Sequence, residues 1–142
     1  MLSALFIPKV FLGQQYSFVV ERAGINGLLK EKYQGHIYRG DSIRQGKYFY
    51  YFDNGRVQQE GFYREGLLDS VWLTYHESGA RKSLFIYEKG LRNGVFTFWN
   101  EDGTLYQTGF YDKGRLSGEL LTYHRNGIID TKSLYADGML NG

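Results

Sequence analysis

The sequence predicts an all-β fold, a single-layer antiparallel β-meander of repeated β-hairpins that forms a twisted, open sheet. Glycine recurs at a constant step of 24 residues in two series, which are Gly55, Gly79, Gly103, Gly127 and Gly66, Gly90, Gly114, Gly138. Runs of apolar and aromatic residues separate these glycines, as strands between turns require. Apolar residues do not keep a spacing of three and four for long enough to form a helix. The aromatic content of 18% also favours strands.

Residues 1–45 are predicted to form a degenerate N-terminal cap and first repeat within a single domain of residues 1–142. A strand is predicted over residues 16–22, a turn over 23–27 and a second strand over 33–40. The connection from Gly40 to Gly46 is two residues longer than its later counterparts. Terminal repeats are commonly atypical because they must cover an exposed sheet edge, and residues 1–15 could do so here.

Residues 46–142 are predicted to form regular repeats of two strands each, opened by Gly46, Ser70, Gly94 and Gly118. The first turn of a repeat ends in Asn-Gly or Asp-Gly, as at Asn54-Gly55, and these pairs accept the positive φ of a tight hairpin. The second connection reads as a longer turn over residues 66–70, 90–94 and 114–118. The strand over residues 128–135 is expected to leave its outer edge unpaired.

Composition and charge exclude several classes of function. The net charge of +2 comes from interleaved acidic and basic residues, which gives no field to attract nucleic acid. The absence of cysteine excludes a disulfide framework and a thiolate zinc site. Pro8 and Lys9 interrupt the apolar N-terminal stretch, so this stretch is interpreted as structural rather than as a signal peptide. We expect a soluble, cytoplasmic protein.

Two aromatic rows are predicted on the first strands of the repeats, on opposite faces of the sheet. One row is the candidate partner-binding site and consists of Tyr51, Tyr75, Trp99 and Tyr123. The other consists of Tyr48, Trp72, Phe96 and Leu120. One row is expected to line a concave groove and the other to pack along the convex side, and the sequence leaves open which does which. Aromatic residues recur at interface hot spots, but cross-strand packing also uses them.

The second strands carry a column of tyrosines without exception, and we assign it to the core of the repeat. Its members are Tyr63, Tyr87, Tyr111 and Tyr135. Their hydroxyl groups are expected to reach backbone groups or water at the margin of the sheet.

The sequence indicates no catalytic residue, cofactor or metal ion. His76 and His124 occupy equivalent positions two repeats apart, which is roughly 20 Å across the sheet and too far for a shared metal ion. His36 has no further ligand at a suitable spacing. The glycines precede strands rather than helices, so they do not form a phosphate-binding loop. We therefore expect no enzyme.

The repeat resembles a known family. The segments Tyr63-REG-LLDS-VWLTYHESG, Tyr87-EKG-LRNG-VFTFWNEDG and Tyr111-DKG-RLSG-ELLTYHRNG are similar to the MORN repeat in its bacterial variant, over roughly residues 33–142. The resemblance implies a single-layer sheet that serves as a binding scaffold without catalysis. Bacterial members are often antitoxins or immunity proteins, whereas eukaryotic relatives organise membrane-associated complexes.

The sequence and this resemblance together predict a non-enzymatic protein-binding module. Its most specific form is an antitoxin or immunity-type protein that neutralises a partner toxin by occlusion. The alternatives are a peripheral scaffold at membrane lipid and a structural module that associates edge to edge with its own copies. The basic residues are offset by neighbouring acidic ones, which gives little attraction to anionic lipid.

Overall fold

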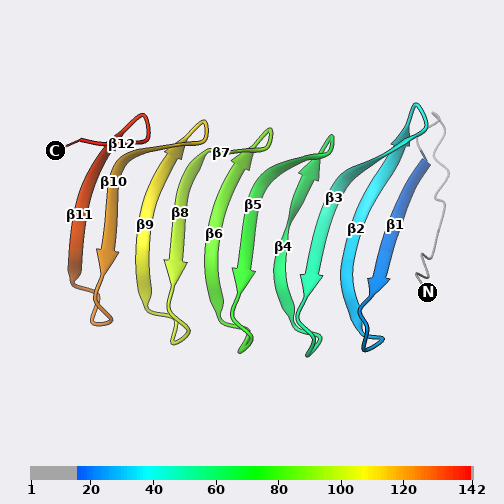
Figure 1. Cartoon of the computed structure of the whole chain (residues 1–142), viewed down its shortest axis with the longest axis horizontal. Helices are drawn as coiled ribbons and strands as arrows, with labels where there is room; N and C mark the ends of the chain where they lie inside the picture. The colour runs from blue at the N-terminus through cyan, green and yellow to red at the C-terminus, as the bar shows by residue number, and fades with distance from the viewer. Residues whose placement is uncertain (1–15, 142) are drawn as a thin grey trace.

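The computed structural model describes residues 16–141, and these contain one antiparallel sheet of 12 strands (Figure 1). Each strand pairs with its neighbours in sequence, except that the short β7 pairs with β6 alone and β8 continues the sheet. The strands are β1 (Tyr16–Ala23), β2 (Leu29–Tyr38), β3 (Asp41–Tyr51), β4 (Val57–Arg64), β5 (Leu67–Tyr75), β6 (Arg81–Glu88), β7 (Leu91–Arg92), β8 (Gly94–Trp99), β9 (Leu105–Asp112), β10 (Arg115–Tyr123), β11 (Ile129–Ala136) and β12 (Met139–Leu140). The predicted fold class, an open meander of hairpins, is confirmed.

The first turn of each repeat forms as the Asn-Gly and Asp-Gly pairs predict. In the turn between β3 and β4, Gly55 has a φ of 81° and the Phe52 amide donates to the Arg56 carbonyl at 2.8 Å. The Asn54 side chain closes the turn by accepting a hydrogen bond from the Arg56 amide at 2.9 Å. This local bond explains why Asn or Asp precedes the glycine.

The second turn is shorter than predicted, and the longer turn over residues 66–70 is wrong. Glu65 and Gly66 both have positive φ, 51° and 79°, which are the two central residues of a type I′ hairpin turn. Strand β5 therefore begins at Leu67. The same pair of positive φ values recurs at Lys89-Gly90.

Ser70 lies in a bulge inside β5 rather than at the end of a turn. It has a φ of 61°, and its counterparts Gly46, Gly94 and Gly118 also have positive φ. Along β5 the four residue steps from Asp69 to Leu73 lie opposite only two steps of β4, from Phe62 to Glu60. The two extra residues force the strand to bend. Figure 1 shows the resulting curve in the upper parts of β3, β5 and β10.

The two faces of the sheet differ in burial. We call the face that carries Trp72 the core face and the face that carries Tyr75 the outer face. On the core face, Trp72 and Phe96 are each only 4% exposed. Among the described residues, no large side chain is less than 2% exposed, so this sheet has an aromatic layer rather than an enclosed nucleus. The row with Tyr48, Trp72, Phe96 and Leu120 is thus the packing row.

Small residues on the core face make room for the large rings. A Cβ atom on Gly61 of β4 would overlap the Trp72 indole, which comes from β5. Gly109 of β9 is covered in the same way, since its Cβ atom would lie 2.5 Å from the Phe96 ring. The Trp72 Nε1 atom also donates to the Phe62 carbonyl at 3.2 Å. Each ring therefore crosses from its own strand onto a neighbouring one.

The rings also contact one another from repeat to repeat. The Trp72 centroid lies 5.5 Å from that of Tyr48 in the preceding repeat and 5.2 Å from that of Tyr63, which it meets edge to face. Phe96 contacts Phe85 at 5.5 Å and Tyr111 at 5.2 Å. Such pairs stabilise by about 0.5–1.5 kcal/mol beyond their buried area. The contacts couple each hairpin to its neighbours.

Arginine side chains complete the core face. The Arg44 guanidinium lies over the Tyr63 ring at 5.3 Å, and Arg92, at the equivalent position two repeats later, lies 5.3 Å from the Tyr111 ring. Arg44 also forms an ion pair at 3.3 Å with the buried Glu31. Three members of the tyrosine column, Tyr63, Tyr87 and Tyr111, contact rings of the packing row, as predicted. The hydroxyl groups of Tyr63 and Tyr111 accept hydrogen bonds from Arg44 and Arg92.

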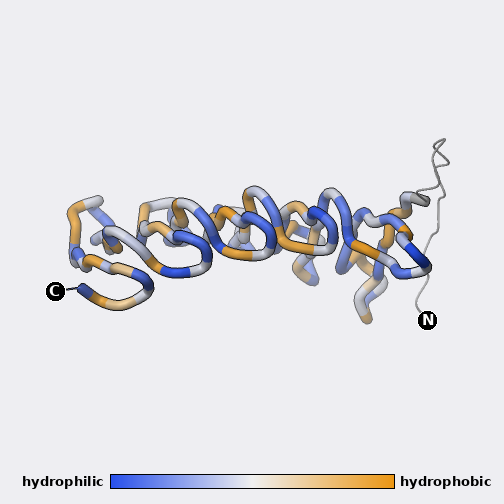
Figure 2. Tube along the Cα trace, turned by 90° about the horizontal axis from the view of Figure 1, so that it is seen from above, coloured by the Kyte–Doolittle hydropathy of each residue, from blue (hydrophilic) through white to orange (hydrophobic). Residues whose placement is uncertain are grey.

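The whole array is elongated, with successive hairpins lying beside one another along its length (Figure 2). In the described part of the chain, no helix has the length and hydropathy needed to cross a bilayer.

The ring over Gly61 makes a specific prediction. Gly61→Ala should lower the free energy of unfolding by about 1–3 kcal/mol, because the added methyl group displaces the Trp72 indole. In a Trp72→Ala background the same change should cost much less. Urea denaturation of the four proteins in this double-mutant cycle measures the difference. Equal costs in both backgrounds would mean that the ring does not lie over the glycine.

The bulge makes a second prediction, with the opposite sign. Ser70→Gly should raise the free energy of unfolding by up to about 1 kcal/mol, because Ser70 has a left-handed φ that a Cβ atom disfavours. Ser42→Gly, in the regular part of β3, is the matched control and should lower stability by about 0.5–1 kcal/mol. Thermal melts that show destabilisation in both variants would contradict the assignment of the bulge.

Candidate protein-binding surface

The four residues of the candidate row lie on the outer face, each at the end of a first strand. Tyr51 ends β3, Tyr75 ends β5, Trp99 ends β8 and Tyr123 ends β10. All four side chains are half-buried. The structure therefore places them in one row across the sheet, next to the first turns. It does not test whether they bind a partner, and that role remains a prediction.

Three members of the row, Tyr75, Tyr51 and Tyr123, contact neighbouring side chains. The Tyr75 hydroxyl donates a hydrogen bond to the Glu60 carboxylate on β4. The Tyr51 ring stacks on Phe49 with centroids 6.4 Å apart. The Tyr123 hydroxyl lies 3.4 Å from the Thr108 hydroxyl. These contacts fix the orientation of the rings before any partner arrives, which lowers the entropic cost of binding.

The burial of Tyr75 changes its acidity. Desolvation, and then the hydrogen bond to the Glu60 carboxylate, raise the pKa of Tyr75 to about 12 from its ordinary value of 10.0. The phenol therefore stays neutral and keeps donating to Glu60 over the whole physiological pH range.

A second feature of the outer face was missed from the sequence. It is an apolar stripe that crosses the sheet in the middle of the strands, where directly paired residues include Val71 with Ile86 and Val95 with Phe110. Val71, Val95 and Phe110 are 44%, 50% and 42% exposed. Exposed apolar surface of this continuity is typical of an interaction site. The step of 24 residues from Val71 to Val95 and from Ile86 to Phe110 was the available signal.

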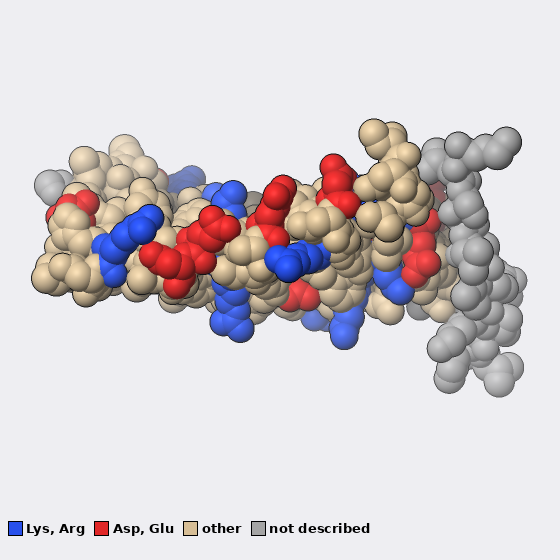
Figure 3. All heavy atoms as spheres, turned by 90° about the horizontal axis from the view of Figure 1, so that it is seen from below, with Lys and Arg blue, Asp and Glu red and all other residues tan. Residues whose placement is uncertain are grey.

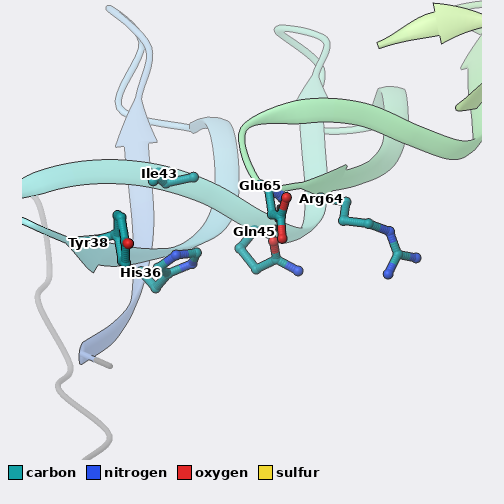
Figure 4. Close-up of a pocket in the computed structure, with 6 residues that line it drawn as sticks. All are labelled: His36, Tyr38, Ile43, Gln45, Arg64 and Glu65. Carbon is teal, nitrogen blue, oxygen red and sulfur yellow. Dashed lines mark hydrogen bonds between the residues drawn. The ribbon is translucent and has the colours of Figure 1, made fainter. Parts of the chain in front are cut away.

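A depression lies at the second-turn margin between β2 and β4. It has a volume of about 650 Å³ and is lined by His36, Tyr38, Ile43, Gln45, Arg64 and Glu65 (Figure 4). The Gln45 side chain is held at the wall of this depression, because its Oε1 atom accepts a hydrogen bond from the Glu65 amide at 2.7 Å. Asn93 makes the equivalent bond to the Lys113 amide at 3.2 Å, beside a smaller depression. Both depressions therefore lie where a Gln or Asn side chain accepts a hydrogen bond from the backbone of a second turn.

His76 and His124 have separate partners. The His76 Nε2 atom lies 3.2 Å from the Trp99 carbonyl oxygen, and His124 lies 3.1 Å from the Asp130 carboxylate. No group of three or more His, Cys, Asp or Glu residues within 16–141 has the arrangement of a metal site.

Charges of both signs are interleaved along the margin formed by the first turns (Figure 3). Lys30 pairs with Asp53 at 2.8 Å, and Arg125 pairs with Asp102 at 3.5 Å. Exposed pairs of this kind contribute little to stability, because water and salt screen the attraction between their charges. They leave no strongly charged patch along this margin.

Comparison with known proteins identifies the repeat. A family model described as the MORN repeat variant matches residues 44–65 and 92–113. The two segments start at Arg44 and Arg92, the arginines that lie over tyrosine rings on the core face. No curated protein matches the chain.

The raised pKa of Tyr75 predicts how stability changes at alkaline pH. Because the folded-state pKa of about 12 exceeds the ordinary 10.0, the neutral phenol contributes stability below pH 10, and this contribution is lost as the pH rises from 10 to 12. Burial also raises the pKa of Tyr48 to about 12, so phenolate absorbance should show two late-ionising phenols in the wild-type chain and one fewer in the Tyr75→Phe variant. The same titration in denaturant provides the control. If the same number of tyrosines ionised late in Tyr75→Phe as in the wild-type chain, the raised pKa of Tyr75 would be contradicted.

Proposed function

Because the chain is built from repeats of the MORN repeat variant family, we propose that it is a non-enzymatic protein-binding module of the antitoxin or immunity type. It neutralises a bacterial toxin by covering the toxin's active site. This role requires a stable surface of suitable shape and no catalytic group. The candidate contact residues are Tyr51, Tyr75, Trp99 and Tyr123.

The outer face is the observation that carries this proposal. It presents the half-buried aromatic row beside the first turns, and within the described residues no second layer covers it. Aromatic residues dominate interface hot spots because they bury a large area at little conformational cost. Tyr75 and Tyr51 are already oriented by Glu60 and Phe49.

The core face is poorly suited to the same task. Trp72 and Phe96 are almost entirely buried, and the Arg44 guanidinium lies over the rings of Tyr33, Tyr48 and Tyr63. A partner that entered this face would have to displace contacts that hold the repeats together. The outer face can be covered without such a cost.

A lipid surface is the competing ligand, and the charges disfavour it. Arg64 pairs with Asp69 at 3.3 Å, and Lys132 pairs with Glu119 at 2.5 Å, both on the outer face. Binding to an anionic membrane needs clustered basic residues that are free of such pairs.

Affinity purification from the native cell tests the proposal. The tagged chain should retain a stoichiometric protein that is toxic when it is expressed alone, and co-expression of the chain should remove the toxicity. Trp99→Ala should weaken capture at least about tenfold, which corresponds to about 1.4 kcal/mol, without a change in fold. Leu140→Ala, at the opposite margin, is the control and should have no effect.

Two results would contradict the proposal. One is the recovery of no stoichiometric protein partner from the native cell. The other is flotation of the chain with anionic vesicles that is unaffected by Trp99→Ala.

A further inference from the structure

We infer that the apolar stripe of the outer face is a self-association surface, on which a second copy of this chain packs face to face about a two-fold axis over Ile86. The inference goes beyond the proposed function, because it concerns the middle of the strands rather than the Tyr75 row. The stripe reads, strand by strand from β3 to β10, Lys47, Phe62, Val71, Ile86, Val95, Phe110 and Glu119.

Strand pairing places these residues in one row. Lys47 lies opposite Phe62, Val71 opposite Ile86, and Val95 opposite Phe110. Between these pairs, Phe62 lies opposite Asp69 and Phe110 lies opposite Ser117. Val71, Val95 and Glu119 lie within the bulged segments of β5, β8 and β10, next to these positions. At a strand spacing of about 4.8 Å, seven strands give a row about 29 Å long. This length matches the width of a standard interface that buries about 800 Å² on each partner.

The row is self-complementary about Ile86. A two-fold axis over β6 places Val71 against Val95 of the second copy and Phe62 against Phe110. Ile86 then lies against its own counterpart. Isologous interfaces require this kind of pairing, in which each residue and its partner exchange roles between the copies. A stripe with an irregular order of large, small and charged residues would not allow it.

The charges at the two ends of the row favour the same arrangement. The axis brings Lys47 of one copy opposite Glu119 of the other, so opposite charges meet twice in each dimer. The Lys47 side chain is exposed, and none of the ion pairs among the described residues includes it. Glu119 is half-exposed and already contacts Lys132 at 2.5 Å. Complementary charges of this kind fix the register of an interface.

The row nearer the second turns shows the same symmetry. Arg64 on β4 and Asp112 on β9 exchange places about the axis, and so do Leu67 and Leu91. Leu67 and Leu91 are 48% and 52% exposed. The axis also brings Glu88, at the end of β6, near its own counterpart. Aligned sheets cross at about 30°, which separates the ends of the central strands and limits this repulsion.

Sedimentation equilibrium of the full chain tests the inference. The wild-type chain should be a dimer at micromolar concentration, and Val95→Asp should make it monomeric with an unchanged circular dichroism spectrum. Lys47→Glu and Glu119→Lys should each weaken the dimer at least about tenfold, because like charges then meet. The double variant Lys47→Glu/Glu119→Lys should restore the dimer, since the charges are again complementary. Glu77→Lys, in a first turn, is the control.

Melting temperatures separate the interface from the fold, because Glu119→Lys also breaks the contact with Lys132 within one chain. A monomeric wild-type chain would overturn the inference. So would a dimer that survives Val95→Asp, which would indicate pairing through a strand edge. Failure of the double charge reversal to restore the dimer would overturn it as well. Capture of a toxin by the monomeric variant would leave the proposed function standing.

Discussion

The structure depends on one packing constraint, that a large ring from one strand lies over a glycine of a neighbouring strand. Trp72 covers Gly61, and Phe96 covers Gly109. A single-layer sheet has no second layer to bury its apolar side chains, so it must bury them against its own backbone and against neighbouring rings. The glycines provide the backbone surface, and the edge-to-face contacts between repeats provide the rest. Stability is therefore a sum of contacts between adjacent hairpins.

This constraint also decides which surface can bind. The bulge at Ser70 and its equivalents bends each first strand, and Arg44 and Arg92 pack over the tyrosines of the core face. The core face is thereby occupied by the contacts that hold the repeats together. The outer face keeps its aromatic row and its apolar stripe exposed or half-exposed. Packing and binding are thus divided between the two faces of one layer.

Much of this architecture could be predicted from the sequence, because a step of 24 residues and Asn-Gly turns leave few alternatives to a meander. The turn at Glu65-Gly66 was misplaced, since nothing in the pattern shows that Glu65 takes a positive φ. The bulge at Ser70 was missed because the two extra residues of β5 can be recognised only from the pairing between β4 and β5. The sequence was enough to place the Tyr75 row on one face of the sheet. It was not enough to predict the side chains that the row contacts, such as Glu60. The stripe through Val95 was missed because its exposure depends on the bend.

The position of the rings over the glycines can be measured most directly by nuclear magnetic resonance. The Hα protons of Gly61 and Gly109 should resonate far upfield of ordinary glycine values, because they lie beneath the Trp72 and Phe96 rings. Cross-peaks should connect each glycine to its ring, and Trp72→Leu should return the Gly61 shift alone to normal. Ordinary shifts at both glycines in the folded wild-type chain would contradict the packing on which this account of the fold depends.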